Sequence, residues 1–185
     1  RSMRFPSAFD HIGPLTMPCE QTNRIVIGAY SPQVCDQLAA VLREIGMKRA
    51  LAPYGMVNGT DSSLGMDEFS LSGPTRVVEL RDGKMETYEV TPEDFGLKTL
   101  PFQMISSRES AQANAQSILV VLSGHYDTPL ADFFCMNAAA ALYISDVASS
   151  YAEGLTLART ALASGKTLQK LEQLKTVQGV QPTSL

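Results

Sequence analysis

The sequence has few of the residues that most often build metal centres, redox sites and nucleophilic sites. It contains two histidines, His11 and His125, and three cysteines, Cys19, Cys35 and Cys135, with no C-x-x-C pair. Two isolated histidines do not make a metal site, and no nucleophile-elbow motif accompanies them. An odd number of cysteines without metal-site spacing is typical of a reduced, cytoplasmic chain.

Two further absences narrow the class of partner. No cluster of Lys and Arg occurs, and the 185 residues carry a formal net charge of -4, so we expect neither a nucleic-acid nor an anionic-membrane surface. The longest apolar run, around residues 138–144, is much shorter than a membrane span, and no signal peptide is evident. With 44% hydrophobic residues, the sequence indicates one soluble globular domain.

The clearest architectural pattern lies in residues 24–54. Residues 24–30 (RIVIGAY) are apolar and rich in β-branched side chains, which predicts a buried strand. Ser31-Pro32 then opens a helix that ends at Gly46. Residues 49–54 predict a second strand, weakened at its end by Pro53. Strand, helix and strand together predict a βαβ unit.

The rest of the chain predicts a hairpin followed by helices. Asp82-Gly83 lies between two apolar alternating runs, which indicates a tight turn between strands at 75–80 and 85–90. Later helix starts are indicated by Thr91-Pro92, by the capping box Ser106-x-x-Glu109, by Thr128-Pro129, and by Ser150-x-x-Glu153. We therefore expect an α/β fold with a mixed, largely parallel sheet flanked by helices and a helical C-terminal cluster.

Adjacent carboxylates, Asp67 and Glu68, follow the polar loop 55–65 at the carboxyl end of the second predicted strand. Open α/β sheets bind ligands at that end. A hard cation such as Mg²⁺ takes one or two carboxylates and fills its other positions with water and phosphate oxygens. The alternative is a solvated acidic turn, since most Asp-Glu pairs are no more than that.

Several segments, in order along the chain, resemble motifs of one enzyme family. Residues 9–18 (FDHIGPLTMP) resemble F-N-x-L-G-P-L-T-N-P, and residues 26–32 (VIGAYSP) are similar to V-I-G-V-Y-x-P. Residues 67–75 (DEFSLSGPT) match D-E-x-S-L-S-G-P-T, and further matches lie at 88–96, 122–124 and 137–143. The set resembles the C-terminal part of anthranilate phosphoribosyltransferase, in the nucleoside phosphorylase/phosphoribosyltransferase superfamily.

The resemblance implies a transfer of phosphoribosyl from phosphoribosyl pyrophosphate to the amine of anthranilate or a related aromatic amine, in tryptophan biosynthesis. It implies a Mg²⁺ ion held by Asp67 and Glu68, and substrate-binding positions at Arg4 and Pro18. It assigns no catalytic side chain, because neutralising the departing pyrophosphate requires little acid–base chemistry of the protein. Residues 1–12 would be a hinge segment and residues 13–185 the α/β phosphoribosyltransferase domain.

The sequence also departs from the family pattern. The helical N-terminal domain and the loop G-T-G-G-D are not in this sequence, so a separate N-terminal half or a second copy is an implied partner and the isolated chain should be inactive. The position of the family's anthranilate-contacting arginine falls on Pro6, its T-N-P asparagine on Met17, and its histidine after the second strand on Tyr54. These changes leave open a second interpretation, in which the chain is an inactive paralogue that acts as a binding protein.

Overall fold

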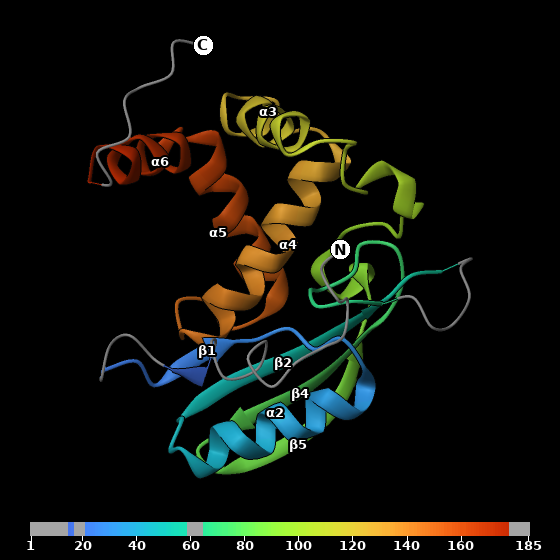
Figure 1. Cartoon of the computed structure of the whole chain (residues 1–185), viewed down its shortest axis with the longest axis vertical. Helices are drawn as coiled ribbons and strands as arrows, with labels where there is room; N and C mark the ends of the chain where they lie inside the picture. The colour runs from blue at the N-terminus through green and yellow to red at the C-terminus, as the bar shows by residue number, and fades with distance from the viewer. Residues whose placement is uncertain (1–14, 17–20, 59–64, 178–185) are drawn as a thin grey trace, which may run out of the picture.

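A sheet of five strands lies between one helix on one face and a cluster of helices on the other (Figure 1). The computed structural model describes residues 15–16, 21–58 and 65–177. The strands are β1 (Arg24–Val26), β2 (Arg49–Met56), β3 (Gly65–Met66), β4 (Thr75–Arg81) and β5 (Lys84–Val90). The helices are α2 (Pro32–Glu44), α3 (Ala111–Leu122), α4 (Pro129–Ile144), α5 (Tyr151–Ala163) and α6 (Lys166–Val177), with short 3-10 helices η1 (Pro92–Phe95) and η2 (Phe102–Met104).

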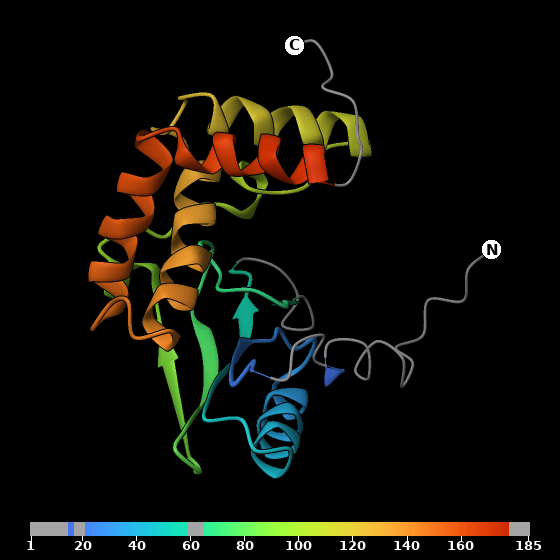
Figure 2. The same ribbon diagram turned by 90° about the vertical axis from the view of Figure 1, so that its left-hand side faces the viewer.

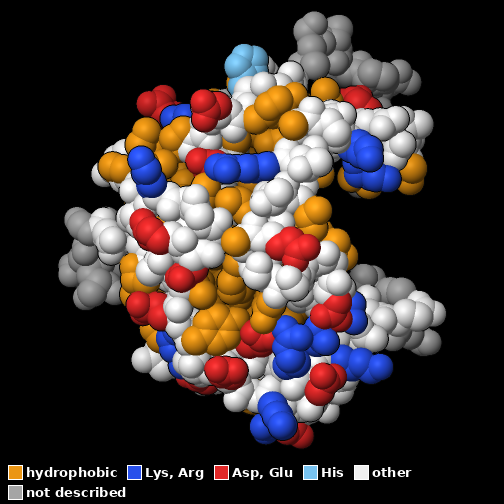
Figure 3. All heavy atoms as spheres, turned by 180° about the vertical axis from the view of Figure 1, so that it is seen from behind, with side chains coloured by type: hydrophobic (Ala, Val, Ile, Leu, Met, Phe, Trp, Pro, Cys, Tyr) orange, Lys and Arg blue, Asp and Glu red, His pale blue; other side chains and the backbone are white. Residues whose placement is uncertain are grey.

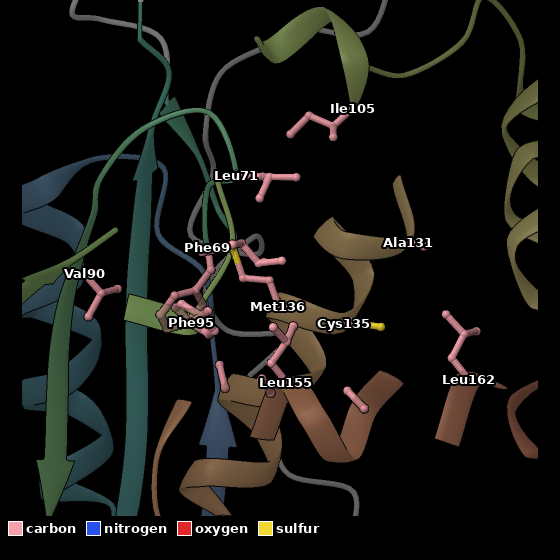
Figure 4. Packing of buried hydrophobic residues seen from close by; sticks show 14 of the residues in the cluster. Phe69, Leu71, Val90, Phe95, Ile105, Ala131, Cys135, Met136, Leu155 and Leu162 are labelled. Atoms are coloured by element: carbon pink, nitrogen blue, oxygen red, sulfur yellow. The ribbon is translucent and has the colours of Figure 1, made fainter. Parts of the chain in front are cut away.

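The two faces of the sheet carry separate apolar cores. Alternate residues of β2 and β4 face α2 on one side, and the others face α4 and α5. On the α4 side, Phe69 and Phe95 point toward Met136 and Leu155, as Figure 4 shows. Figure 2 shows α3 and α6 at the end of the molecule farthest from α2. Within the described ranges no helix has both the length and the apolar composition needed to cross a membrane.

The expected mixed α/β fold with flanking helices is confirmed, but the sheet is not largely parallel. The strand order is β1-β2-β4-β5, with β3 paired to β2. In the described part of the chain only β1 and β2 run parallel, while β2–β3, β2–β4 and β4–β5 are antiparallel. The reason lies in the connections. A helix joins β1 to β2, whereas the turn at Asp82 and Gly83 joins β4 directly to β5, and both turn residues have positive φ angles of 49° and 81°.

Strand β1 is shorter than expected, and Pro53 explains why. The ladder from β1 continues beyond Val26, because the Ile27 N–H donates to the Leu51 carbonyl and the Ala29 N–H to the Pro53 carbonyl, each over 2.9 Å. Pro53 has no N–H to return the next bond, so regular pairing stops at Val26. Pro53 does not end β2, which continues to Met56 and pairs with β4 along its other edge.

Four of the five expected helix starts are confirmed, among them Thr91 before the 3-10 helix η1, and one is wrong. The hydroxyls of Ser31, Thr128 and Ser150 accept backbone hydrogen bonds at the starts of α2, α4 and α5. The cap of α3 is Ser110, whose hydroxyl accepts from Ala113 over 3.1 Å. Ser106 instead donates to the Gln103 carbonyl at the end of η2. The S-x-x-E spacing at 106–109 was therefore a local coincidence in a bend that precedes the helix.

A row of four cations crosses one end of the sheet. Arg24 pairs with Arg49, Arg49 with Arg81, and Arg81 with Lys84 across neighbouring strands. Like charges directly opposite each other destabilise a sheet. Asp146, just after α4, offsets this repulsion because it forms ion pairs with Arg24 and Arg49 and lies 4.0 Å from Arg81. Figure 3 shows basic and acidic side chains intermingled over the lower part of this view.

Glu79 supplies the second negative charge at this row. It is only 7% exposed and accepts from the Arg81 guanidinium over 2.8 Å and from the Tyr88 hydroxyl over 2.7 Å. Burial, first, and the neighbouring Tyr151 and Glu79, second, raise the pKa of Tyr88, so its hydroxyl stays protonated and can donate. The buried carboxylate is thus paired and hydrogen-bonded, which a buried charge requires.

We expect Asp146→Asn to destabilise the fold by about 1–2 kcal/mol. Asn also tolerates the left-handed backbone that Asp146 adopts (φ 60°), so the substitution removes only the charge that offsets the arginines. Urea unfolding measures the loss. The difference in unfolding free energy between this variant and the wild type should become smaller in 1 M salt, where exposed charges are screened. Asp127→Asn, the same change at an exposed residue, is the control and should be neutral. Equal stability of the two variants would show that Asp146 has no such role.

Candidate functional site

The acid pair lies where the two parallel strands end. Strand β3 pairs antiparallel with the end of β2, Met66 opposite Gly55, and Asp67 follows directly. The backbone of Asp67 also packs against Gly28, two residues beyond the end of β1. Asp67 and Glu68 therefore sit at the carboxyl ends of the β1–β2 pair, which is the location that the sequence predicted and where α/β sheets hold ligands.

Two glycines allow the acid segment to approach the sheet this closely. A Cβ atom at Gly28 would lie 1.7 Å from the carbonyl oxygen of Asp67. A Cβ atom at Gly55 would lie 2.4 Å from the carbonyl oxygen of Glu68. Neither position has room for a side chain, and in both cases the obstacle is backbone that cannot rotate away. The main chain of the acid pair thus packs directly against Gly28 and Gly55 at the ends of β1 and β2, and we call this close contact the seat of the acid pair.

The residues that follow the pair bind it to the rest of the fold. The ring of Phe69 is fully buried and packs edge-on against Phe95, with ring centroids 5.8 Å apart. The Ser70 hydroxyl donates to the Met56 carbonyl over 2.6 Å, and the Ser70 N–H donates to the Thr75 hydroxyl over 2.8 Å. The small polar residues of the DEFSLSGPT stretch therefore shape a turn between β3 and β4.

Helix α4 reaches the acid segment through one side chain. The amide of Asn137 accepts from the Phe69 N–H over 2.8 Å and donates to the Phe69 carbonyl over 3.1 Å. Asn137 thus ties α4 to the acid segment by hydrogen bonds to its backbone. Its partner could not be inferred from the sequence, because 68 residues separate the two and no local pattern links them.

Both carboxylates are available to a ligand. Asp67 and Glu68 are exposed, and within the described residues neither forms an ion pair with Lys or Arg. Glu68 is exposed as a residue but its carboxyl is partly shielded from water; this shielding, first, and the negative charge of Asp67, second, raise the pKa of Glu68 above its ordinary value. The two acids therefore repel each other when no cation is present.

The residues present suit Mg²⁺. In the described part of the chain no group of three or more His, Cys, Asp or Glu side chains comes together, so the candidate ligands there are these two carboxylates. Magnesium is commonly bound by one or two carboxylates and completes its shell with water and substrate phosphates. Two exposed, mutually repelling carboxylates at the end of a sheet fit that pattern.

The other residues singled out from the sequence do not lie with the acid pair in the described structure. Arg4 and Pro18, the implied substrate-binding positions, lie outside the described residues, as does the segment 1–12. Tyr54, which stands where the family has a histidine, is 5% exposed, and its ring fills the space beside Gly65. Tyr54 is thus a core residue of this chain and does not present its ring to a ligand.

We expect Gly28→Ala to destabilise the chain by about 1–3 kcal/mol and to shift the backbone amide resonances of Asp67 and Glu68. The added methyl group would overlap the carbonyl of Asp67, so the acid segment has to move. Gly154→Ala is the matched control, because its Cβ would lie 2.7 Å from the Ala139 carbonyl, between α4 and α5. It should also lower stability but leave those two amide resonances in place. Unshifted resonances in Gly28→Ala would refute the proposed seat.

Comparison with known proteins assigns the chain to a family. Residues 1–168 match the family model described as "Glycosyl transferase family, a/b domain". Anthranilate phosphoribosyltransferase from Polynucleobacter necessarius is 41% identical over 167 residues, covering 89% of this chain and 45% of the relative. The enzyme from Methanococcus maripaludis is 38% identical over 176 residues, covering 95% and 50%. The chain thus spans about half the length of these relatives.

Solved structures agree with the sequence matches. Anthranilate phosphoribosyltransferase from Thermus thermophilus superposes with a TM-score of 0.76 at 33% identity, over 92% of this chain and 47% of that one. The Saccharomyces cerevisiae enzyme in complex with PRPP and Mg gives a TM-score of 0.76 at 28% identity, over 91% and 46%. By its matched a/b domain this chain belongs to the glycosyl transferase family, and it corresponds to the C-terminal part of the anthranilate phosphoribosyltransferases.

Proposed function

We propose that this chain is the α/β part of a phosphoribosyltransferase that moves phosphoribosyl from phosphoribosyl pyrophosphate to anthranilate or a related aromatic amine, in tryptophan biosynthesis. The observation that carries the proposal is the pair Asp67 and Glu68, exposed and without a cationic partner in the described chain, at the ends of β1 and β2. Among the matched structures, one Saccharomyces cerevisiae enzyme is in complex with PRPP and Mg and another with 4-fluoroanthranilate, which supports the substrates.

The proposed reaction requires that the negative charge on the departing pyrophosphate be neutralised. Breaking the bond between C1 of the ribose and the pyrophosphate oxygen places negative charge on the leaving group. A bound Mg²⁺ would supply the positive charge that offsets it. Asp67 and Glu68 would hold the ion, and the seat on Gly28 and Gly55 fixes where they hold it. Preorganised groups of this kind lower the barrier because they need no rearrangement as the charge develops.

The proposed enzyme works in the cytoplasm and needs the half of the relatives that this chain does not span. Cys35 and Cys135 are buried free thiols, which suits a reducing compartment. The alternative is an inactive paralogue that binds ligands without turnover. Buried Tyr54, in place of the family's histidine, favours that alternative, whereas the available acid pair favours the enzyme.

The double variant Asp67→Asn with Glu68→Gln should weaken Mg²⁺ binding at least about tenfold and leave thermal stability unchanged or slightly higher. Removing two charges that repel each other stabilises the folded state at neutral pH. Because the pKa of Glu68 is raised on folding, this gain in stability should shrink as the pH falls below the raised folded-state pKa and should be absent below the unfolded value of about 4.3. Titration with Mg²⁺, followed by amide chemical shifts and by thermal melting, measures both effects.

A second adjacent acid pair provides a matched control. Glu93 and Asp94 are exposed, but Glu93 accepts from the Thr99 N–H over 2.9 Å and Asp94 from the Thr91 N–H over 2.7 Å. Glu93→Gln with Asp94→Asn makes the same change in net charge, so it should lower stability and leave Mg²⁺ binding intact. If the 67/68 variant unfolds earlier and binds Mg²⁺ like the wild type, the pair is structural and the proposed metal role is wrong.

We also expect residues 1–185 alone not to turn over phosphoribosyl pyrophosphate. The sequence has no G-T-G-G-D loop, so the pyrophosphate would be held only through the metal and its two carboxylates. The loss of anthranilate fluorescence in the presence of Mg²⁺ measures turnover. Adding an N-terminal half from a relative tests the two functions against each other, since an inactive paralogue would stay silent. Rapid turnover by the verified single chain would contradict the expectation.

A further inference from the structure

We propose that Asn137 is a positioning residue for the metal-binding acids, acting from helix α4 on the peptide bond that joins Glu68 to Phe69. The inference rests on the proposed function of Asp67 and Glu68. Within the described chain Asn137 forms no hydrogen bond with either carboxylate. The hydrogen bonds of its side-chain amide are all with backbone groups. Its effect on a metal ion would therefore be exerted through the backbone.

The hydrogen bonds of Asn137 fix one residue at both of its polar groups. Oδ1 accepts from the Phe69 N–H over 2.8 Å, and Nδ2 donates to the Phe69 carbonyl over 3.1 Å. Nδ2 also donates to the Phe133 carbonyl, one turn earlier in α4, over 3.1 Å. Both amide hydrogens are thus used, and the side chain cannot rotate without breaking all three bonds.

The Glu68–Phe69 peptide is consequently held from two sides. Its N–H binds Asn137, and its carbonyl oxygen, which belongs to Glu68, lies against Gly55 where a Cβ would be 2.4 Å away. A planar peptide fixed at both ends has a fixed orientation. That orientation sets the direction in which the Glu68 side chain leaves the backbone. Residues that support metal ligands through hydrogen bonds typically change metal affinity by about 10–100-fold when replaced.

Asn114 shows the same geometry in a place without acids. Its Oδ1 accepts from the Arg108 N–H over 2.7 Å, and its Nδ2 lies 3.5 Å from the Arg108 carbonyl. It brackets one backbone residue just before α3, as Asn137 brackets Phe69. Replacing Asn114 therefore reproduces the loss of a side-chain bracket on a backbone residue, far from the proposed metal position.

The test compares Asn137→Ala, Asn137→Ser and Asn114→Ala in the ¹⁵N-labelled chain, with Mn²⁺ alone as the paramagnetic probe. Serine in a helix can donate to the carbonyl four residues earlier, so Asn137→Ser retains a bond to Phe133 and loses only the bracket on Phe69. Asn137→Ser replaces Asn137→Ala in the test if the alanine variant does not fold. The measurement is the Mn²⁺ concentration that half-broadens the amide signals of residues 67–69.

We expect both Asn137 variants to need about tenfold more Mn²⁺ than the wild type, and Asn114→Ala to match the wild type. A wild-type midpoint in a folded Asn137 variant, or an equal shift in Asn114→Ala, would overturn the inference. Failure of the proposed function looks different, because Mn²⁺ would then not broaden these signals even in the wild type. In that event the Glu68 resonances decide on Asn137 alone: their displacement in both Asn137 variants, and not in Asn114→Ala, supports positioning of the acid segment, and unchanged Glu68 resonances refute it.

Discussion

The constraint on which the site depends is the close approach of one main-chain segment to the ends of two strands. Residues 67 and 68 lie so near Gly28 and Gly55 that neither glycine can carry a side chain. Because the backbone occupies the space next to the sheet, the carboxylates are left on the outside, exposed to solvent. Phe69 then turns into the core beside Phe95. The exposure of the acids and the burial of the next residue are two consequences of a single path of the chain.

The acids of this protein divide by what neutralises them. Glu79 is buried and has an arginine and a tyrosine as partners, and Asp146 pairs with two arginines. These carboxylates stabilise the fold because an opposite charge lies beside each. Asp67 and Glu68 instead have a like charge as neighbour, and the pKa of Glu68 is raised by burial, first, and by the charge of Asp67, second. Within the described chain this pair has no cationic partner and repels itself, so it adds nothing to stability, and the proposed metal role rests on that contrast.

Helix starts and the hairpin turn could be predicted from local sequence patterns. The end of β1 and the support of the acid segment could not, because they depend on contacts between residues distant in sequence. Ser31, Thr128 and Ser150 could be recognised as caps, since a cap bonds within its own first turn. The acid pair was found from its motif and its place after β2. The early end of β1 depends on Pro53 in another strand, and the bracket on Phe69 comes from a helix 68 residues away. Such contacts follow only from the packed fold, as does the antiparallel pairing of β2 with β3 and β4.

Helix α4 links the two ends of the parallel strand pair. Asn137, midway along it, binds the acid segment at the carboxyl ends, while Ser145 and Asp146, just past its end, bind Arg24 at the start of β1. Eight residues of helix rise roughly 12 Å, and the four residues of extended chain from Arg24 to Gly28 cover roughly 13 Å. The two lengths are similar, so one helix can contact both ends of this segment. The arginine row at one end of the sheet and the acid pair at the other are therefore held in register by the same helix.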